Sequence, residues 1–378
     1  MKKVGIITFH NSYNCGSMLE TFAMQEIIRK GGLKSEIVNF SSLGQIKLYN
    51  AWFENNSLKN IVKNFLIMPH INRIKNNNKK YIDFQKKYFK LSEFTTVSNT
   101  LNDDAYDTVI SGSDQIWNIT IDDYDDAYFL NWVQNAKKIA YSPSFGSKNI
   151  LKYSNNPDTY AQYILSYDAV SVRENNGKKW INDLTGLDVP VLLDPTLLLE
   201  KKDYENLIAK DVNENGEYIF FYSPGFNKDI CKYVKRVADK YNMRVITWSS
   251  KSYYVKNVKK YGFSLPKYEN PEVYLYLIKN AKLIFTTSYH GTIFSTIFKK
   301  KFYTIKNGGM YGDDDRVITL LNQINLLDRL IPYKFDDTFD YMSEPNFDES
   351  DKNLSKLREK SVKFLTDNIR GFKYEARK

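Results

Sequence analysis

The chain has 378 residues, about twice the usual size of one domain, so we expect two domains, each large enough to bury its own core. Its 42% apolar and 26% charged residues exclude a disordered or fibrous protein. No apolar run approaches the roughly 20 residues of a membrane-spanning helix, and the N-terminus turns polar too soon for a secretory signal, so we expect a cytoplasmic protein. The two cysteines, Cys15 and Cys231, form no CxxC pair, which argues against a disulfide framework and a cysteine zinc site.

The basic residues are concentrated in one segment. The net charge of the chain is +10, and residues 59–90 hold nine basic residues against one acid, Asp83. Apolar residues recur at helical spacing where this segment begins, at Leu58, Ile61, Val62, Phe65 and Leu66. The pattern is typical of a helix that lies on an anionic membrane surface, as in a peripheral membrane protein, although a helix packed on its own domain would also give it. Because no nucleic-acid-binding motif accompanies the charge, we expect no nucleic-acid partner.

The first half of the chain alternates short strands with helices. The apolar run 2–9 predicts a strand, and residues 17–30 predict a helix that ends at two glycines. Further strands are predicted at 107–111, 138–142, 168–172 and 190–193. Strands that alternate with helices are typical of a parallel sheet.

The second half of the chain repeats this architecture. The predicted strands lie at 217–222, 244–248, 283–288 and 301–305, and the predicted helices lie at 228–241, at 271–280 and from about 291. The polar stretch 196–217 between the two series is interpreted as a linker. The tail, 352–370, also predicts a helix.

We therefore predict an α/β fold of two Rossmann-like lobes with parallel sheets and a cleft between them. The first lobe is assigned to residues 1–200, with the basic helical insertion at about 55–90, and the second lobe to residues 205–345. The C-terminal helical segment, 350–378, is expected to pack back on the first lobe.

Only three histidines occur, so a reaction that needs an imidazole has few candidates. His290 stands where an apolar strand turns into a helix after Gly291, at the carboxyl edge of a parallel strand where ligands bind. The start of that helix favours a phosphate or carboxylate, and a histidine beside a bound phosphate can donate a proton. The alternative is a histidine that only caps the helix. His10 follows the first strand in the same topological position and is a candidate to line the cleft, whereas His70 receives no role.

Two further strand ends carry polar residues. The guanidinium of Arg173, after the strand 168–172, matches a phosphate or carboxylate, unless it pairs with an acid such as Asp194. The strand 107–111 leads into four residues that suit a ligand rich in hydroxyls, namely Asp114, Gln115, Trp117 and Asn118. The indole of Trp117 would stack on a sugar ring, or it belongs to the core.

The sequence lacks the signatures of several enzyme classes. It contains no GxSxG elbow, no HExxH pair, no kinase signature set, no Walker loop, no GxGxxG and no Cys/His cluster. We therefore expect neither a metal nor a resident cofactor.

Five motifs, in this order and at these intervals, resemble the polysaccharide pyruvyl transferase family, and they are NCGSMLETFAMQ, VISGSDQIWN, AVSVRENNG, VLLDPTLLL and LIFTTSYHGTIFS. The resemblance covers roughly residues 1–330. It implies two Rossmann-like lobes in a GT-B-like arrangement, with an acceptor side in the first and a donor side in the second. It also implies transfer of the enolpyruvyl carbons of phosphoenolpyruvate to two hydroxyls of a sugar as a cyclic ketal.

The resemblance implies roles for the candidate residues. His290 matches the family's histidine and would be the general acid, and Arg173 matches the arginine of an S-x-R element and would clamp the donor. The backbone N–H groups of Gly291 and Thr292 would help to bind the donor. The expected acceptor contacts are Asp114, Gln115, Trp117, Asn118 and His10.

One position departs from the family pattern. Family members often carry an arginine two residues before the histidine, whereas this chain has Ser288, which we place among the donor-binding residues. Arg316 and Lys306 are candidates to replace the missing charge.

Three functions remain open at this point. The first is a pyruvyl transferase of capsule, exopolysaccharide or cell-wall glycan synthesis, whose acceptor would be undecaprenyl-linked if the basic segment contacts a membrane. The second is a GT-B-like glycosyltransferase that uses a nucleotide sugar. The third is a non-catalytic saccharide-binding protein of the same pathway.

Overall fold

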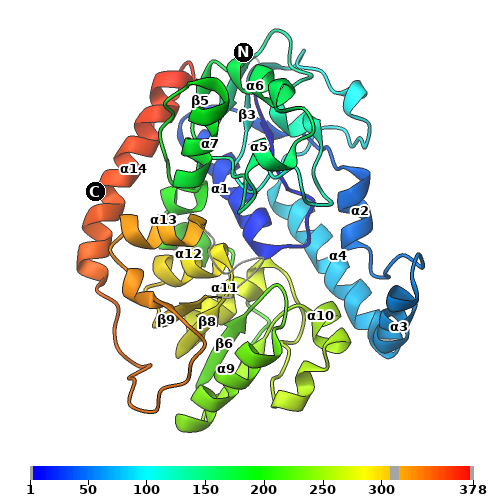
Figure 1. Cartoon of the computed structure of the whole chain (residues 1–378), viewed down its shortest axis with the longest axis vertical. Coiled ribbons are helices and arrows are strands. Elements are labelled where there is room, and N and C mark those ends of the chain that lie inside the picture. Colours follow the sequence, from blue (N-terminus) through cyan, green and yellow to red (C-terminus); the bar gives the residue numbers. More distant parts are fainter. Residues whose placement is uncertain (1–2, 307–314, 375–378) are drawn as a thin grey trace. The chain divides into compact units, whose positions relative to one another are not determined.

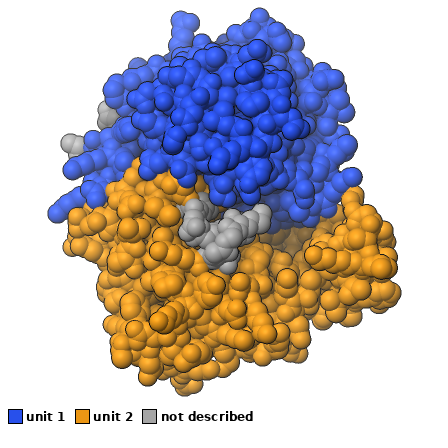
Figure 2. All heavy atoms as spheres, in the orientation of Figure 1, with its two compact units in different colours: residues 1–49, 85–199, 352–378 blue, residues 50–84, 200–351 orange. Residues whose placement is uncertain are grey.

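The computed structural model describes residues 3–306 and 315–374, and the chain divides into two compact units, which Figure 2 shows in different colours. Unit 1 consists of residues 1–49, 85–199 and 352–378, and unit 2 consists of residues 50–84 and 200–351. Each unit is built around one parallel sheet with helices between its strands, so the predicted two Rossmann-like α/β lobes are confirmed.

The sheet of unit 1 has five strands in the order β2-β1-β3-β4-β5, and all neighbours are parallel (Figure 1). The strands are β1 (Lys3–Ile7), β2 (Ser35–Ile37), β3 (Tyr106–Ser111), β4 (Lys137–Ala140) and β5 (Ala169–Val170). β1 and β3 end side by side, with Ile7 opposite Ser111. The strand predicted at 190–193 is reduced to a bridge between Val172 and Val191, because Pro190 has no N–H to extend the ladder.

The sheet of unit 2 repeats this strand order as β7-β6-β8-β9-β10, again with parallel neighbours. The strands are β6 (Tyr218–Tyr222), β7 (Arg244–Thr247), β8 (Leu283–Thr286), β9 (Phe302–Ile305) and β10 (Leu330–Ile331). In both units the first strand lies between the second and the third. The chain therefore winds away in opposite directions after the first and third strands, and doubly wound sheets bind ligands at the carboxyl edge of such a point.

Helices connect the strands of each unit. Those of unit 1 are α1 (Cys15–Lys30), α2 (Leu43–Tyr49), α5 (Ile150–Tyr153), α6 (Pro157–Leu165) and α7 (Asn175–Thr185). Those of unit 2 are α3 (Leu58–Ile67), α8 (Lys201–Glu205), α9 (Lys228–Lys240), α10 (Ser250–Val255), α11 (Pro271–Asn280), α12 (Tyr289–Ile297) and α13 (Asp315–Gln323). α4 (Ile71–Tyr88) and α14 (Phe347–Asn368) contain residues of both units. The short 3₁₀ helices are η1 (Met68–His70), η2 (Ser98–Thr100), η3 (Asp126–Phe129), η4 (Pro195–Leu198), η5 (Val258–Tyr261) and η6 (Leu327–Arg329).

Local sequence fixes where the helices begin. The Asn270 side chain accepts a hydrogen bond from the N–H of Val273, and Pro271 occupies the first turn of α11, where a missing N–H costs nothing. At α1, the Asn14 side chain accepts a hydrogen bond from the N–H of Gly16 at 2.9 Å. This cap fixes the start of α1 at Cys15, shortly after β1, and the residues of the first turns of α1 are buried.

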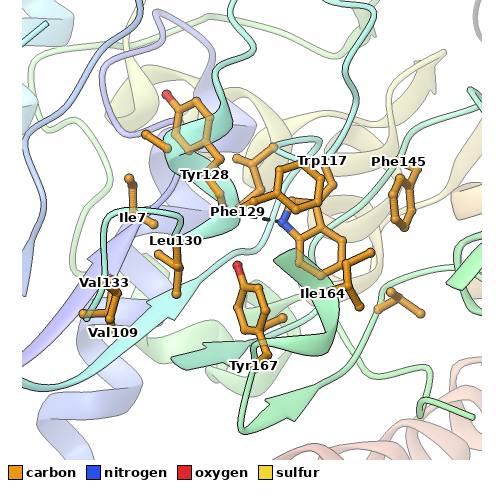
Figure 3. Close-up of a cluster of buried hydrophobic side chains, with 14 of the residues drawn as sticks. Ile7, Val109, Trp117, Tyr128, Phe129, Leu130, Val133, Phe145, Ile164 and Tyr167 are labelled. Atoms are coloured by element: carbon orange, nitrogen blue, oxygen red, sulfur yellow. Dashed lines mark hydrogen bonds between the residues drawn. The ribbon is translucent and has the colours of Figure 1, made fainter. Parts of the chain in front are cut away.

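The core of unit 1 contains the tryptophan of the VISGSDQIWN motif (Figure 3). Trp117 is fully buried, and its ring stacks on that of Phe129 with centroids 4.9 Å apart. Phe145 and Tyr167 contact the same indole from other sides. The sugar-stacking role predicted for Trp117 is therefore wrong, since aromatic residues of the core already surround the ring, and the alternative of a core residue is confirmed.

The basic segment differs from its predicted place. We assigned residues 55–90 to the first lobe, but residues 50–84 belong to unit 2. Ile67 and Ile74 pack with Ala51 and Tyr254 of that unit, so the apolar contacts of this segment determine its position. At the other end of the chain, residues 352–378 belong to unit 1, where Ser361 Oγ of α14 accepts a hydrogen bond from the N–H of Leu193 at 3.1 Å.

Candidate active site

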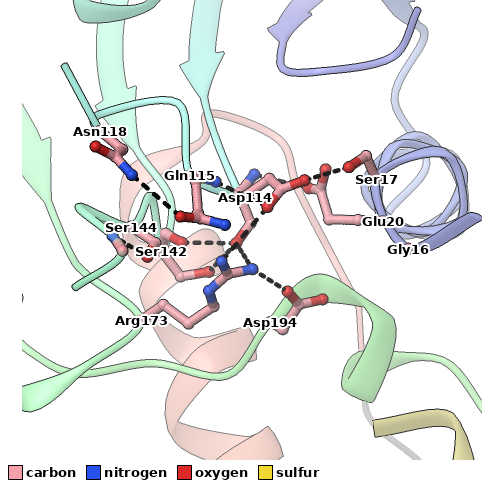
Figure 4. Close-up of polar contacts among 12 residues, drawn as sticks. Gly16, Ser17, Glu20, Asp114, Gln115, Asn118, Ser142, Ser144, Arg173 and Asp194 are labelled. Carbon is pink, nitrogen blue, oxygen red and sulfur yellow. Dashed lines mark hydrogen bonds and ion pairs between the residues drawn. The ribbon is translucent and has the colours of Figure 1, made fainter. Parts of the chain in front are cut away.

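In unit 1, a buried polar network lies behind the ends of β1 and β3 (Figure 4). Arg173 is its one cation, and the guanidinium Nη1 donates to Asp194 Oδ2 at 2.7 Å. The Nη2 atom lies 3.5 Å from Asp114 Oδ1, and Ser17 Oγ donates to the other oxygen of Asp114. The side chain of Arg173 is completely buried. Because Asp194 and Asp114 face the guanidinium, the alternative that Arg173 pairs with Asp194 is confirmed, and its role as a clamp for the donor stays a prediction.

Glu20 of α1 is a third carboxyl group of the network, and sequence reasoning missed it. Its Oε1 accepts a hydrogen bond from the N–H of Ser113 at 2.7 Å. Burial, together with the carboxylates of Asp194 and Asp114, raises the pKa of Glu20 well above its ordinary value. The sequence signal that could have identified Glu20 is an acid within the apolar run of α1, where the neighbours on every side of the helix are buried.

Thr8, directly after β1, connects Glu20 with the loop after β3. Its Oγ1 donates to Glu20 Oε2 at 3.0 Å and lies 3.1 Å from the carbonyl oxygen of Ser113. The Thr8 hydroxyl therefore holds Glu20 against the loop whose Ser113 N–H donates to the other carboxyl oxygen.

The remaining predicted acceptor residues lie at the rim of this network. Asn118 Nδ2 donates to the Gln115 side chain at 3.2 Å, while Asn118 Oδ1 accepts from Thr120. Gly146 lies against both amides, since a Cβ added there would come within 2.4 Å of Gln115 Oε1 and 2.9 Å of Asn118 Nδ2. Asp114 and Gln115 thus share one loop with polar atoms close to the end of β3.

His10 does not line a binding surface in unit 1. Its imidazole is buried, with Nε2 2.9 Å from Asn39 Oδ1 and Nδ1 3.3 Å from the carbonyl oxygen of Thr8. Burial lowers the pKa of His10. Hydrogen bonds within the protein occupy both ring nitrogens, so the predicted contact of His10 with an acceptor is not supported.

In unit 2, the equivalent strand ends carry hydroxyl groups and His290. Ser223, after β6, and Thr287, after β8, join their side-chain oxygens at 2.9 Å. His290 follows in the first turn of α12 and is mostly buried, as predicted for a residue at the carboxyl end of β8. Gly291 lets α12 start close to the strand, because a Cβ there would lie 2.1 Å from Thr286 Oγ1.

The first turn of α12 differs from the predicted anion site in its hydrogen bonds. Ser288 is the N-cap, and its Oγ accepts from the N–H of Gly291 at 3.4 Å. The N–H of Thr292 donates to the carbonyl oxygen of Ser288 at 3.0 Å. These two N–H groups, which we expected to bind the donor, therefore have partners inside the helix cap.

Arg316 of α13 lies next to the His290 segment. Its guanidinium carbon is 5.8 Å from the centre of the Tyr289 ring, and that ring is 5.4 Å from the imidazole of His290. Arg316 is also buried. Tyr289 thus connects the candidate general acid with the cation that we expected to replace the missing family arginine, whereas Lys306 is exposed.

The two α/β units have the strand order of doubly wound sheets, and polar side chains gather where that order reverses. These features define a protein of the Rossmann-like class. The profile of the polysaccharide pyruvyl transferase family matches residues 14–309. The chain therefore belongs to this family of transferases, as its motifs predicted. No curated protein matches the chain.

The solved structures that match this chain have little sequence in common with it. The UDP-GlcNAc 2-epimerase of Neisseria meningitidis is 10% identical, with 97% of this chain and 100% of the other covered and a TM-score of 0.46. The putative UDP-N-acetylglucosamine 2-epimerase of Listeria monocytogenes is 8% identical, with 99% and 93% covered and a TM-score of 0.49. The E. coli heptosyltransferase WaaC is 14% identical, with 97% and 100% covered and a TM-score of 0.38.

Proposed function

We propose that this protein transfers the enolpyruvyl carbons of phosphoenolpyruvate to two hydroxyls of a sugar, as a cyclic ketal. The observation that carries the proposal is the position of His290, at the carboxyl end of β8 where the strand order of unit 2 reverses. The membership of the chain in the pyruvyl transferase family supports it.

The reaction assigns His290 the role of proton donor. A proton added to the methylene carbon of phosphoenolpyruvate makes the adjacent carbon electrophilic, and one sugar hydroxyl attacks that carbon and loses its proton. Phosphate then leaves with the electrons of its C–O bond, and the second hydroxyl closes the ketal and releases its own proton. An imidazole that donates the first proton can accept one of the two released.

The donor carries a phosphate and a carboxylate, and the cation Arg316 lies 5.8 Å from the ring of Tyr289, which adjoins His290. A guanidinium binds either group with two parallel hydrogen bonds. Ser223 and Thr287 add hydroxyl groups at the same strand ends. We assign the donor to unit 2 on this basis.

We assign the acceptor to the network of unit 1. Asp114 and Asp194 together exceed the single charge of Arg173, whatever the charge on Glu20, so the network repels an anion and attracts hydroxyl donors. Asp114 is the carboxylate on the loop that also bears Gln115, and its Oδ1 accepts a hydrogen bond from the N–H of Gln115. A sugar of a capsule, exopolysaccharide or cell-wall glycan is the acceptor that we propose, linked to undecaprenyl phosphate.

The test is a reaction with phosphoenolpyruvate and candidate glycans, followed by mass spectrometry and a phosphate assay. We expect one ketal-linked pyruvate per acceptor and one phosphate released for each. Consumption of a nucleotide sugar without phosphoenolpyruvate would overturn the proposal in favour of a glycosyltransferase. A protein that binds saccharide but releases no phosphate from any donor would overturn it in favour of a binding protein.

A further inference from the structure

Helix α3 is oriented with its apolar side toward solvent. Leu58 is 83% exposed, Val62 56% and Phe65 66%. Val62 follows Leu58 after four residues, and Phe65 and Leu66 follow Val62 after three and four, so the side chains form a continuous stripe. We call this stripe, with Met68 of η1, the α3 apolar face. Because helices normally bury such a stripe, an exposed one marks a surface that binds something.

The opposite side of α3 carries amides and packs against its own unit. Asn64 accepts a hydrogen bond from the N–H of Phe53 at 2.9 Å and donates to the carbonyl oxygen of the same residue. The Nζ atom of Lys63 lies 4.6 Å from the centre of the Phe53 ring, and the Nζ atom of Lys251, on α10, lies 3.9 Å from it. The polar side of the helix is thus held by specific contacts. A rotation of α3 that would bury the apolar stripe would break them.

The connection to α4 fixes α3 further. His70 stacks on Tyr254 with ring centres 3.6 Å apart, and Arg73 donates to Ser250 Oγ at 3.2 Å. A hollow of about 520 Å³ adjoins the apolar face and is lined by Trp52, Phe53, Asn55, Ile61, Asn64, Phe65 and Met68. Figure 1 shows α3 beside α10 at the start of α4. These contacts therefore hold the α3 apolar face in a fixed position on the surface of unit 2.

The charge around this face selects its partner. Residues 58–84 contain six basic residues and one acid, and Lys59, Lys75 and Lys79 are exposed. A second copy of the chain would bring the same positive charge to the contact, which opposes association. Aliphatic and aromatic side chains beside lysines match a bilayer with anionic headgroups, since the stripe enters the acyl boundary while the lysines meet phosphates. Among the described residues, no helix is long and apolar enough to cross a bilayer, so the contact would be interfacial.

We propose that the α3 apolar face and its flanking lysines bind the surface of an anionic lipid bilayer. This inference is independent of the reaction proposed above, although it would bring the enzyme to a lipid-linked acceptor. Both parts of the surface are needed, because a short apolar stripe alone gives weak and reversible binding.

The test is sedimentation of the full chain with vesicles of pure phosphatidylcholine or of phosphatidylcholine with phosphatidylglycerol. We expect binding to the anionic vesicles, weakened by high salt, and little binding to the neutral ones. The affinity of the variant Val62→Ser/Phe65→Ser for the anionic vesicles should fall by about tenfold or more. A matched control, Phe94→Ser/Leu165→Ser, replaces two apolar side chains of unit 1 that are 51% and 55% exposed and should leave binding unchanged.

The melting temperature of each variant shows whether it folds, and turnover of a water-soluble acceptor keeps this test separate from that of the enzyme activity. Equal binding by the α3 variant and the wild type would overturn the membrane proposal. The proposal would also be overturned if the wild type did not bind vesicles but formed dimers that the α3 variant does not form. The α3 apolar face would then join two copies of the chain. Failure of ketal formation alone would leave the vesicle result standing.

Discussion

The two units share one strand order but carry opposite chemistry where that order reverses. In unit 1 a hydroxyl after the first strand, that of Thr8, lies 3.1 Å from the carbonyl oxygen of Ser113 after the third strand. In unit 2, Ser223 and Thr287 connect the equivalent loops at 2.9 Å. The surroundings differ, since buried carboxyl groups fill the first site, whereas His290 and Arg316 adjoin the second. The fold thus supplies two similar positions, and the loop residues decide what each can bind.

This comparison gives each unit a separate signature under mutation. Changes in the buried network of unit 1 should alter stability and acceptor binding, because acids already hold its Arg173. Changes near His290 should alter turnover and donor binding. Five variants test the distinction, beginning with the one for which we expect the largest effect.

Replacing Arg173 by Met should give the largest loss, which we expect in the stability of unit 1. The substitution leaves Asp114 and Asp194 buried without the guanidinium that faces both. Removal of one partner from a buried ion pair costs about 3–5 kcal/mol. Urea unfolding measures this loss, and Arg173→Lys, which keeps the charge, should recover part of it. If Arg173→Met unfolds like the wild type but no longer binds phosphoenolpyruvate, Arg173 is a donor clamp after all.

Replacing His290 by Ala should lower kcat by about a hundredfold or more, because the imidazole is the proposed proton donor. The fold should tolerate the change, and the melting temperature checks this. His70→Gln serves as the control, since His70 lies on the half-exposed 3₁₀ helix η1 and has no proposed role in the reaction. A kcat for His290→Ala within threefold of wild type would contradict the assignment.

Replacing Arg316 by Ala should raise the KM for phosphoenolpyruvate by about tenfold with a smaller change in the KM for the sugar, because a charge-assisted contact to the donor is lost. Asp114→Asn should show the reverse pattern, with the acceptor KM raised and the donor KM unchanged. Steady-state kinetics with each substrate varied in turn measures both. Equal effects of the two variants on both substrates would break the separation between the units.

The sequence predicted the sheets better than the contacts of single side chains. The strand and helix patterns located β3, β6, β8 and α11 closely, since apolar runs, caps and prolines act over a few neighbouring residues. β2 and β10 were not predicted, because each has only two or three residues and depends on the neighbouring strand.

Candidate site residues were harder to predict, because burial depends on contacts distant in sequence. Trp117 and Arg173 both lie in motifs shared with a transferase family, but the first is packed against Phe129 and the second against Asp194. No local pattern distinguishes an indole on a sugar from an indole in a core. His290 and Arg316 were proposed from position and from charge, and the structure places Tyr289 beside both.

The smallest expected effect concerns Glu20 and the dependence of stability on pH. A carboxyl group whose pKa is raised by folding stabilises the protein at low pH, and this contribution is lost as the pH rises through the raised pKa. The wild type should therefore lose melting temperature as the pH rises above the ordinary pKa of a glutamate. Glu20→Gln removes the ionisation and keeps an acceptor for the N–H of Ser113, so its melting temperature should fall less over the same range.

The comparison of Glu20→Gln with Glu20→Ala separates charge from hydrogen bonding. Glu20→Ala also removes the ionisation, but it leaves the buried N–H of Ser113 without its acceptor and should cost about 1–3 kcal/mol at every pH. If Glu20→Gln and the wild type lose melting temperature in parallel up to pH 9, Glu20 is ionised in the folded protein. The network of unit 1 would then carry one more negative charge, which would strengthen its contrast with the His290 site.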